Sequence, residues 1–147
     1  ATIRSGAYEK YLHKKDGTLD LFTQACPLFV PLVENGRVHR GDVVIETVVK
    51  EYLTPLKDAG VDTLILGCTH YPIVEENFHE CYPEMHLINP ALEQANAVKA
   101  YLTEQNALNP QKKGKFVICT SGDPQVYVNV GKRLGLFEAS ELKVVHI

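Results

Sequence analysis

A cysteine and a histidine lie two positions apart in the tetrapeptide GCTH at residues 67–70, directly after an apolar run at residues 61–66. A thiolate is a strong nucleophile or base, and an imidazole exchanges protons near neutral pH. Thr69, between them, adds a hydroxyl and a backbone N–H that could hold a carboxylate. Cys68 and His70 therefore predict a reactive thiol with an acid–base partner.

Two other interpretations of these residues stay open at this point. Cysteine is among the most buried residue types, so Cys68 could be an inert part of a core. A zinc site could also use Cys68 and His70 with His79 and Cys81, which repeat the same residue types. In a helix, however, nine residues span roughly 13 Å, which is too far for one compact site, and we expect no bound metal.

The elements around Cys68 would place it where open parallel sheets bind ligands. The run at 61–66 is typical of a strand covered on both faces, and Pro72 suits the first turn of a following helix. Ligands bind beyond the carboxyl ends of parallel strands. The first turn of a helix also offers unpaired N–H groups that favour a thiolate, so this arrangement favours a functional Cys68.

The rest of the chain alternates between apolar strands and amphipathic helices, which predicts a layered α/β fold with a parallel sheet. The segment QACPLFVPLVENG at residues 24–36 is predicted to be an apolar loop, because its prolines suit neither a ladder nor a helix interior. Pro55 predicts a kink or an early end in the longest helix. Helices are expected at 5–12, 42–58, 73–80, 90–102 and from 124, and strands at 19–21, 61–66, 85–88, 115–120 and 142–147.

The composition is typical of a globular chain in a reducing compartment. The 147 residues are 45% hydrophobic and carry a net charge of −3, with no bank of basic residues, so we expect no nucleic-acid partner. No apolar run reaches the roughly 20 residues of a membrane span, and we expect no membrane partner and no signal peptide. The cysteines at 26, 68, 81 and 119 form no CxxC pair, which favours free thiols and a cytoplasmic protein.

Four motifs, in this order along the chain, resemble the glutamate racemase family of the aspartate/glutamate racemase superfamily. ATIRSGAYEKYL at the start is similar to the segment that follows the first lobe in that family. ACPLFVPLVENG resembles its apolar proline segment, and LILGCTHYP its second catalytic motif. CTSGDPQVYVNVGKRLG resembles its C-terminal strand–turn–helix, so the likeness covers essentially the whole chain.

The resemblance implies cofactor-independent racemisation of L-glutamate to D-glutamate for peptidoglycan synthesis. The family uses two cysteines, one on each face of the α-carbon, without pyridoxal phosphate or metal. Cys68 matches one of this pair, and His70 matches the histidine that assists proton transfer. Glu34 matches the acidic residue that pairs with that histidine, and Thr69 and His70 match contacts to the substrate.

The resemblance also implies that the site is incomplete within these 147 residues. The family's Asp-Ser pair and Ala-Cys-Asn-Thr stretch, which carries the other thiol, have no counterpart here. The expected architecture is a racemase-like lobe at residues 1–90 carrying Cys68, followed by residues 91–147, which complete a second lobe that is largely missing. We expect the chain alone to be inactive, and a homodimer is a possible assembly.

Two alternatives to a glutamate racemase follow from the same residues. Aspartate racemases, hydantoin racemases and maleate isomerases share the two-lobed fold and a cysteine in the second lobe. A chain of this kind could also act as a non-catalytic binding scaffold. The combination of GCTHYP with ACPLFVPLVE favours glutamate.

Overall fold

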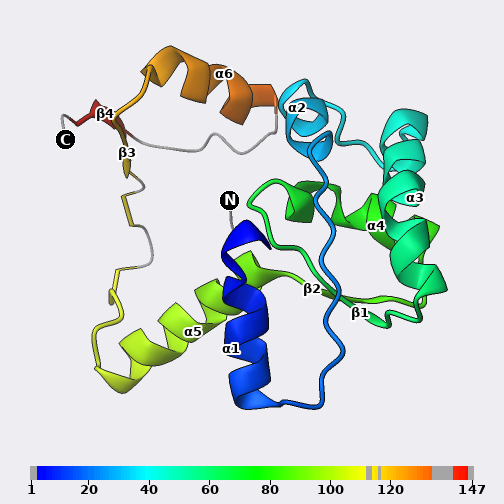
Figure 1. The fold of residues 1–147 in the computed structure, drawn as a ribbon. Helices are drawn as coiled ribbons and strands as arrows, with labels where there is room; N and C mark the ends of the chain where they lie inside the picture. The colour runs from blue at the N-terminus through cyan, green and yellow to red at the C-terminus, as the bar shows by residue number, and fades with distance from the viewer. Residues whose placement is uncertain (1–2, 112–113, 116, 134–140, 146–147) are drawn as a thin grey trace.

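The computed structural model shows helices alternating with short parallel strands (Figure 1). It describes residues 3–111, 114–115, 117–133 and 141–145. The elements are η1 (Ile3–Ser5), α1 (Ala7–Lys15), α2 (Phe29–Glu34), α3 (Val43–Asp58), β1 (Thr63–Ile65), η2 (Tyr71–Val74), α4 (Glu75–Cys81), β2 (His86–Ile88), α5 (Pro90–Glu104), β3 (Val117–Thr120), α6 (Pro124–Arg133) and β4 (Glu141–Val144), where η denotes a 3₁₀ helix.

The strands form two separate parallel pairs. β1 pairs with β2, with Leu64 opposite Leu87, and β3 pairs with β4, with Ile118 opposite Leu142. Each pair is joined through a helix, as parallel strands require. The predicted α/β class with parallel strands is confirmed. The last two residues of the strand expected at 142–147 lie outside the described residues.

The longest helix, α3, begins where the sequence predicts. The Asp42 carboxylate caps it by accepting hydrogen bonds from the N–H groups of Val44 and Ile45, at 2.9 and 3.3 Å. The helix ends at Asp58, as the expected range of 42–58 has it, so of the two effects expected of Pro55 the early end does not occur. Proline removes one intrahelical hydrogen bond, and burial of Leu53 and Leu56 against the core stabilises the last turns despite this loss.

Two other predictions from the sequence are wrong. The proline segment is not a loop throughout, since α2 forms within it. Pro31 is the third residue of α2, in the first turn, where backbone N–H groups have no intrahelical acceptor and a proline costs little. Residues 19–21 form no strand, because alternation over three residues is a weak signal without a partner strand.

The hydrophobic core lies within residues 26–85. Phe29 is fully buried and contacts the rings of Tyr52, Tyr71 and Phe78, with centroids 5.6, 5.4 and 5.1 Å from its own. It therefore joins α2, α3, η2 and α4 in one cluster. The other buried apolar residues are Cys26, Val33, Ile45, Val48, Val49, Leu53, Leu56, Leu66, Val74, Tyr82 and Met85.

The helix that follows β2 contributes nothing to this core. Figure 1 shows α5 leading away from β2 toward the extended segment that carries β3. α5 buries none of its residues, and its Leu92, Val98 and Tyr101 are each more than half exposed. Much of the apolar surface of α5 is therefore exposed in the described part of the chain, although packing is what mainly stabilises an amphipathic helix. No helix in the described part of the chain is long and apolar enough to cross a membrane.

Candidate active site

Cys68 lies at the carboxyl end of β1, as the sequence predicts. The Leu66 N–H continues the ladder by donating to the carbonyl of Ile88 at 3.0 Å. Two tight turns follow, in which the Gly67 N–H donates to the Ile65 carbonyl and the Cys68 N–H donates to the Leu66 carbonyl, both at 2.8 Å. These two short-range bonds turn the backbone out of the sheet and place Cys68 at its edge.

The helix end that was expected to activate Cys68 is different in the structure. The Cys68 N–H is already bonded to Leu66, and the following helix begins as the four-residue 3₁₀ helix η2. α4 contributes only seven further residues. A short helix of two types has a weak dipole, so the surroundings of Cys68 depend on side chains more than on a helix terminus.

His70 is brought into contact with Glu34 from a distant part of the chain. Its Nε2 lies 3.1 Å from Glu34 Oε1, and its Nδ1 lies 3.2 Å from the Oγ1 of Thr69. The His70 side chain is 24% exposed and that of Glu34 is 44% exposed. Glu34 is the last residue of α2, so the proline segment folds back over the turn that carries Cys68 and places this carboxylate.

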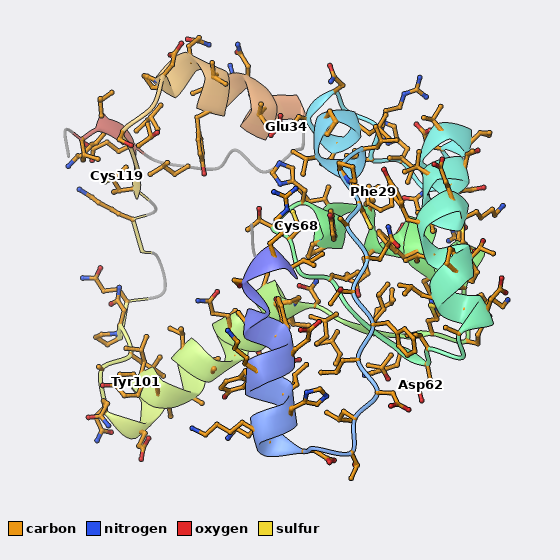
Figure 2. All side chains as sticks on the ribbon, viewed as in Figure 1. Phe29, Glu34, Asp62, Cys68, Tyr101 and Cys119 are labelled. Carbon is orange, nitrogen blue, oxygen red and sulfur yellow. The ribbon has the colours of Figure 1, made fainter. Side chains whose placement is uncertain are left out.

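Cys68 itself is half-buried and is a free thiol. Figure 2 shows Cys68 and Glu34 on the same side of the first unit, which is the part of the chain around the hydrophobic core at residues 26–85, with Phe29 between them and α3. Within the described residues, neither ring nitrogen of His70 is bonded to the Cys68 sulfur, since their partners are Glu34 and Thr69. In the described part of the chain, the hydrogen bonds of His70 therefore link it to Glu34 and Thr69 and not to the thiol.

Tyr71 and Cys26 link the proline segment to the turn that follows Cys68. The Tyr71 hydroxyl donates to the Cys26 carbonyl at 3.2 Å and ties the proline segment to the turn after Cys68. Its ring packs edge-to-face on Phe29, with centroids 5.4 Å apart. Burial raises the pKa of the Tyr71 hydroxyl to about 12 and that of the Cys26 thiol to about 11. Both groups are therefore neutral near pH 7 and act as structural supports.

Tyr8 is a neighbour of the site that sequence reasoning missed. A Cβ added to Gly67 would lie 3.4 Å from the Tyr8 hydroxyl oxygen, so this ring from α1 lies against the residue before Cys68. A single aromatic on an amphipathic helix gives no signal that distinguishes this contact from packing. α1 buries none of its residues, and Tyr8 brings this helix into contact with the strand end.

Two cavities of the described residues are lined by side chains other than Cys68. One, of about 910 Å³, is formed mainly by α4 and the segment leading into β2, and includes Arg40 and Glu80. Another, of about 490 Å³, lies along α5 and Leu108. In the described part of the chain, no three His, Cys, Asp or Glu side chains cluster in a way that could hold a metal ion.

Comparison with known proteins matches the chain to glutamate racemases, although no family model matches it. It is 37% identical over 134 residues to the glutamate racemase of Thermoanaerobacter sp. strain X514, covering 90% of this chain and 50% of that protein. With the glutamate racemase of Sulfurihydrogenibium sp. strain YO3AOP1 it shares 44% identity over 127 residues, covering 86% of this chain and 46% of that protein. The chain thus spans about half the length of the curated relatives it matches.

Solved structures give the same result. Glutamate racemase from Francisella tularensis, in complex with D-glutamate, matches with a TM-score of 0.84 and 34% identity, covering 99% of this chain and 54% of that one. Glutamate racemase from Thermus thermophilus, in complex with β-chloro-D-alanine, matches with a TM-score of 0.82 and 36% identity, covering 100% and 54%. The fold of this chain is therefore that of about half of these proteins.

Proposed function

Because this chain is a homologue of glutamate racemases that spans about half of their length, we propose that it forms part of such a racemase, with Cys68 as one of two acid–base thiols. Racemisation requires a base that removes the α-proton of glutamate and an acid that returns a proton to the opposite face. Cys68 would serve one face as thiolate or thiol. The proposed reaction uses no pyridoxal phosphate and no metal.

The observation that carries this proposal is the group of side chains around the strand end. His70 follows Cys68 by two residues, and its ring is oriented by Glu34 at 3.1 Å, which supports a histidine held in place close in sequence to the thiol. In the proposal His70 assists proton transfer, Glu34 holds its ring, and Thr69 and His70 contact the substrate. Cys68 is half-buried at the carboxyl end of β1, whereas the Cys26 thiol is buried in the core.

We also propose the division of the chain that the sequence suggests. Residues 1–90 form the lobe with Cys68, and residues 91–147 complete a second lobe whose remainder comes from the other half of the racemase. The position of the core within residues 26–85 and the exposed apolar side chains of α5 support this division. So does the share of the Francisella and Thermus proteins, about half of each, that has no counterpart here.

The cellular role follows from the proposed reaction. D-glutamate is used in peptidoglycan, so a racemase of this kind would act in the cytoplasm in cell-wall synthesis on a small-molecule substrate, as a possible homodimer. The relatives and structures reported above are all named glutamate racemase. Neither the alternative superfamily activities nor a binding scaffold gains support from any particular contact in the structure.

The test is a completed racemase, in which this chain is joined to the part of the Thermoanaerobacter protein that it lacks. D-glutamate formation from L-glutamate is then compared between this protein and its Cys68→Ser and Cys119→Ser variants. The proposal expects Cys68→Ser to lose activity and Cys119→Ser to retain it. Cys119 is a suitable control because it is exposed, lies on β3 and takes no part in the group around His70.

A further inference from the structure

The His70 imidazole is held at both of its nitrogens by oxygen atoms of different chemistry. Nε2 lies 3.1 Å from a carboxylate oxygen of Glu34, and Nδ1 lies 3.2 Å from the hydroxyl oxygen of Thr69. A neutral imidazole has one N–H donor and one acceptor nitrogen. Which nitrogen carries the proton therefore depends on which of the two bonds has a fixed direction.

The directions of the two hydrogen bonds follow from what each partner can do. An ionised carboxylate only accepts hydrogen bonds, so Nε2 must donate to Glu34 and must carry a proton. The neutral ring then has its lone pair on Nδ1. A threonine hydroxyl can donate or accept, so it donates to this lone pair. Both bonds are satisfied in one tautomer and only one of them in the other.

We propose that Thr69 is a positioning residue, which with Glu34 holds His70 in the Nε2–H form, so that the ring gains and loses its proton only at Nδ1. When Nδ1 takes up a proton, the Thr69 hydroxyl rotates and becomes the acceptor of that N–H. The hydrogen bond therefore persists in both protonation states. The ring keeps its orientation while the proton is exchanged.

The consequence for catalysis rests on the proposed function of Cys68. Preorganised groups contribute to catalysis because they need no rearrangement during proton transfer. A histidine bonded on one side only could rotate between protonation states, whereas His70 is fixed on both. The atom that exchanges protons is Nδ1, on the side of Thr69, and Nε2 is committed to Glu34.

Thr69 is a suitable site for a substitution that separates positioning from folding. Its side chain is exposed and it lies outside the hydrophobic core. Thr69→Val keeps the shape and removes the hydroxyl, and Thr69→Ser keeps the hydroxyl and removes the methyl group. Glu34→Gln provides a second variant, because an amide can donate as well as accept and no longer requires a proton on Nε2.

The experiment is nitrogen NMR of the 147-residue chain with ¹⁵N-labelled histidine. The signals of His70 are identified as those absent from a His70→Gln variant, and amide spectra of each variant check that the chain is folded. Measurement at about pH 8.5, two units above the ordinary imidazole pKa of about 6.5, reports the neutral ring. Measurement at about pH 5 reports the protonated ring.

The proposal expects fully separated signals at high pH, with the proton on Nε2. On lowering the pH, the Nδ1 signal shifts strongly and the Nε2 signal shifts little. Thr69→Val moves the Nδ1 signal at high pH toward that of a ring nitrogen without a hydrogen bond, and Thr69→Ser leaves it unchanged. Glu34→Gln brings the two signals closer together, because both tautomers become populated.

Two results would overturn the proposal. One is a wild-type ring with its proton on Nδ1 or with signals averaged between the two tautomers. The other is an Nδ1 signal that is the same in Thr69→Val as in the wild type. These results do not depend on catalysis. A completed racemase that stays active without Cys68 would overturn the proposed function and leave the tautomer of His70 unaffected.

Discussion

His70 Nε2 lies 3.1 Å from Glu34 Oε1, although the two residues are 36 positions apart in the chain. The contact exists because α2 folds out of the proline segment and Phe29 anchors it to the core, with Tyr71 bonded to the Cys26 carbonyl beneath the turn. The same packing that stabilises the first unit therefore brings a carboxylate to the histidine beside Cys68.

Replacing Glu34 by glutamine is expected to lower the activity of a completed racemase with little loss of stability. An ion pair at this exposure contributes no more than about 1 kcal/mol to the free energy of unfolding, whereas misplacing a reacting group can cost up to about a hundredfold in rate. Glu84→Gln is the matched control, since Glu84 pairs with Lys57 at 2.8 Å on an exposed surface. Steady-state kinetics and urea denaturation check both expectations. Equal rates for the two variants would contradict the account.

The four thiols are expected to differ in their rate of alkylation by iodoacetamide. Burial raises the pKa of Cys26 to about 11 and also raises the pKa of Cys81. At about pH 8, only about one Cys26 in a thousand is a thiolate, and the thiolate is the reactive form. Mass spectrometry over time should show Cys68 modified well before Cys26 and Cys81. Modification of Cys26 at the same rate as Cys68 would show that this part of the core is open.

Phe29→Ala is expected to destabilise the first unit by about 3–5 kcal/mol, because it removes a ring that joins α2, α3, η2 and α4. Phe22→Ala is the control. Its ring is 53% exposed in this chain, and surface substitutions usually change stability by about 0.5 kcal/mol or less. Urea denaturation followed by circular dichroism measures both. A similar, small change for both variants would mean that the aromatic cluster is not the core of the unit.

Asp42 is expected to make stability depend on pH at the start of α3. Burial alone raises the pKa of its carboxyl, but hydrogen bonds from the Ile45 and Val44 N–H groups and from Arg37 outweigh this and lower it. A lowered pKa in the folded state gives a stabilisation that is present above the unfolded value of about 3.9 and is lost as the pH falls through the folded value.

Two substitutions at this cap separate charge from hydrogen bonding. Asp42→Asn keeps an oxygen that accepts from the helix N–H groups, so it should retain most of the stability at neutral pH and lose the dependence below about pH 4. Asp42→Ala should cost about 1 kcal/mol at neutral pH. Unfolding measured from about pH 7 to 3 distinguishes the three proteins. If the free energy of unfolding of the wild-type protein changed with pH no more than that of Asp42→Asn in this range, the assigned role of Asp42 would be contradicted.

The sequence predicts the elements that depend on local signals. The helices expected at 42–58 and 90–102 form as α3 and α5, which begin after the side-chain caps Asp42 and Asn89, and alternation of strands and helices predicts the parallel sheet. These signals are strong because a cap or a period of 3.6 residues lies within one short window.

The parts that the sequence does not predict depend on tertiary contacts. α2 forms across Pro31 because its Phe29 and Val33 are buried, and no local pattern shows that burial in advance. The Tyr8 contact with Gly67 joins residues about 60 positions apart, and neither residue type signals it. The pairing of Glu34 with His70 came from the family resemblance, since spacing alone does not fix a contact between a helix end and a strand end.

The chain alone is expected to form no D-glutamate above a Cys68→Ser control. Racemisation needs a second base on the opposite face of the α-carbon, and the buried Cys26 thiol, with a pKa raised to about 11, is unsuited to that role. A sensitive assay is chiral separation of glutamate after long incubation. D-glutamate that appears with the chain and is absent with the variant would show that one half suffices.

The most direct measurement of the central claim is the rate at which the completed racemase forms D-glutamate, compared between its Cys68→Ser and Cys119→Ser variants. A group that transfers protons in the transition state contributes about a hundredfold to ten-thousandfold, so Cys68→Ser should fall by at least that much while Cys119→Ser stays near the unsubstituted rate. Activity of Cys68→Ser within tenfold of the Cys119→Ser protein would contradict the role of this thiol in racemisation.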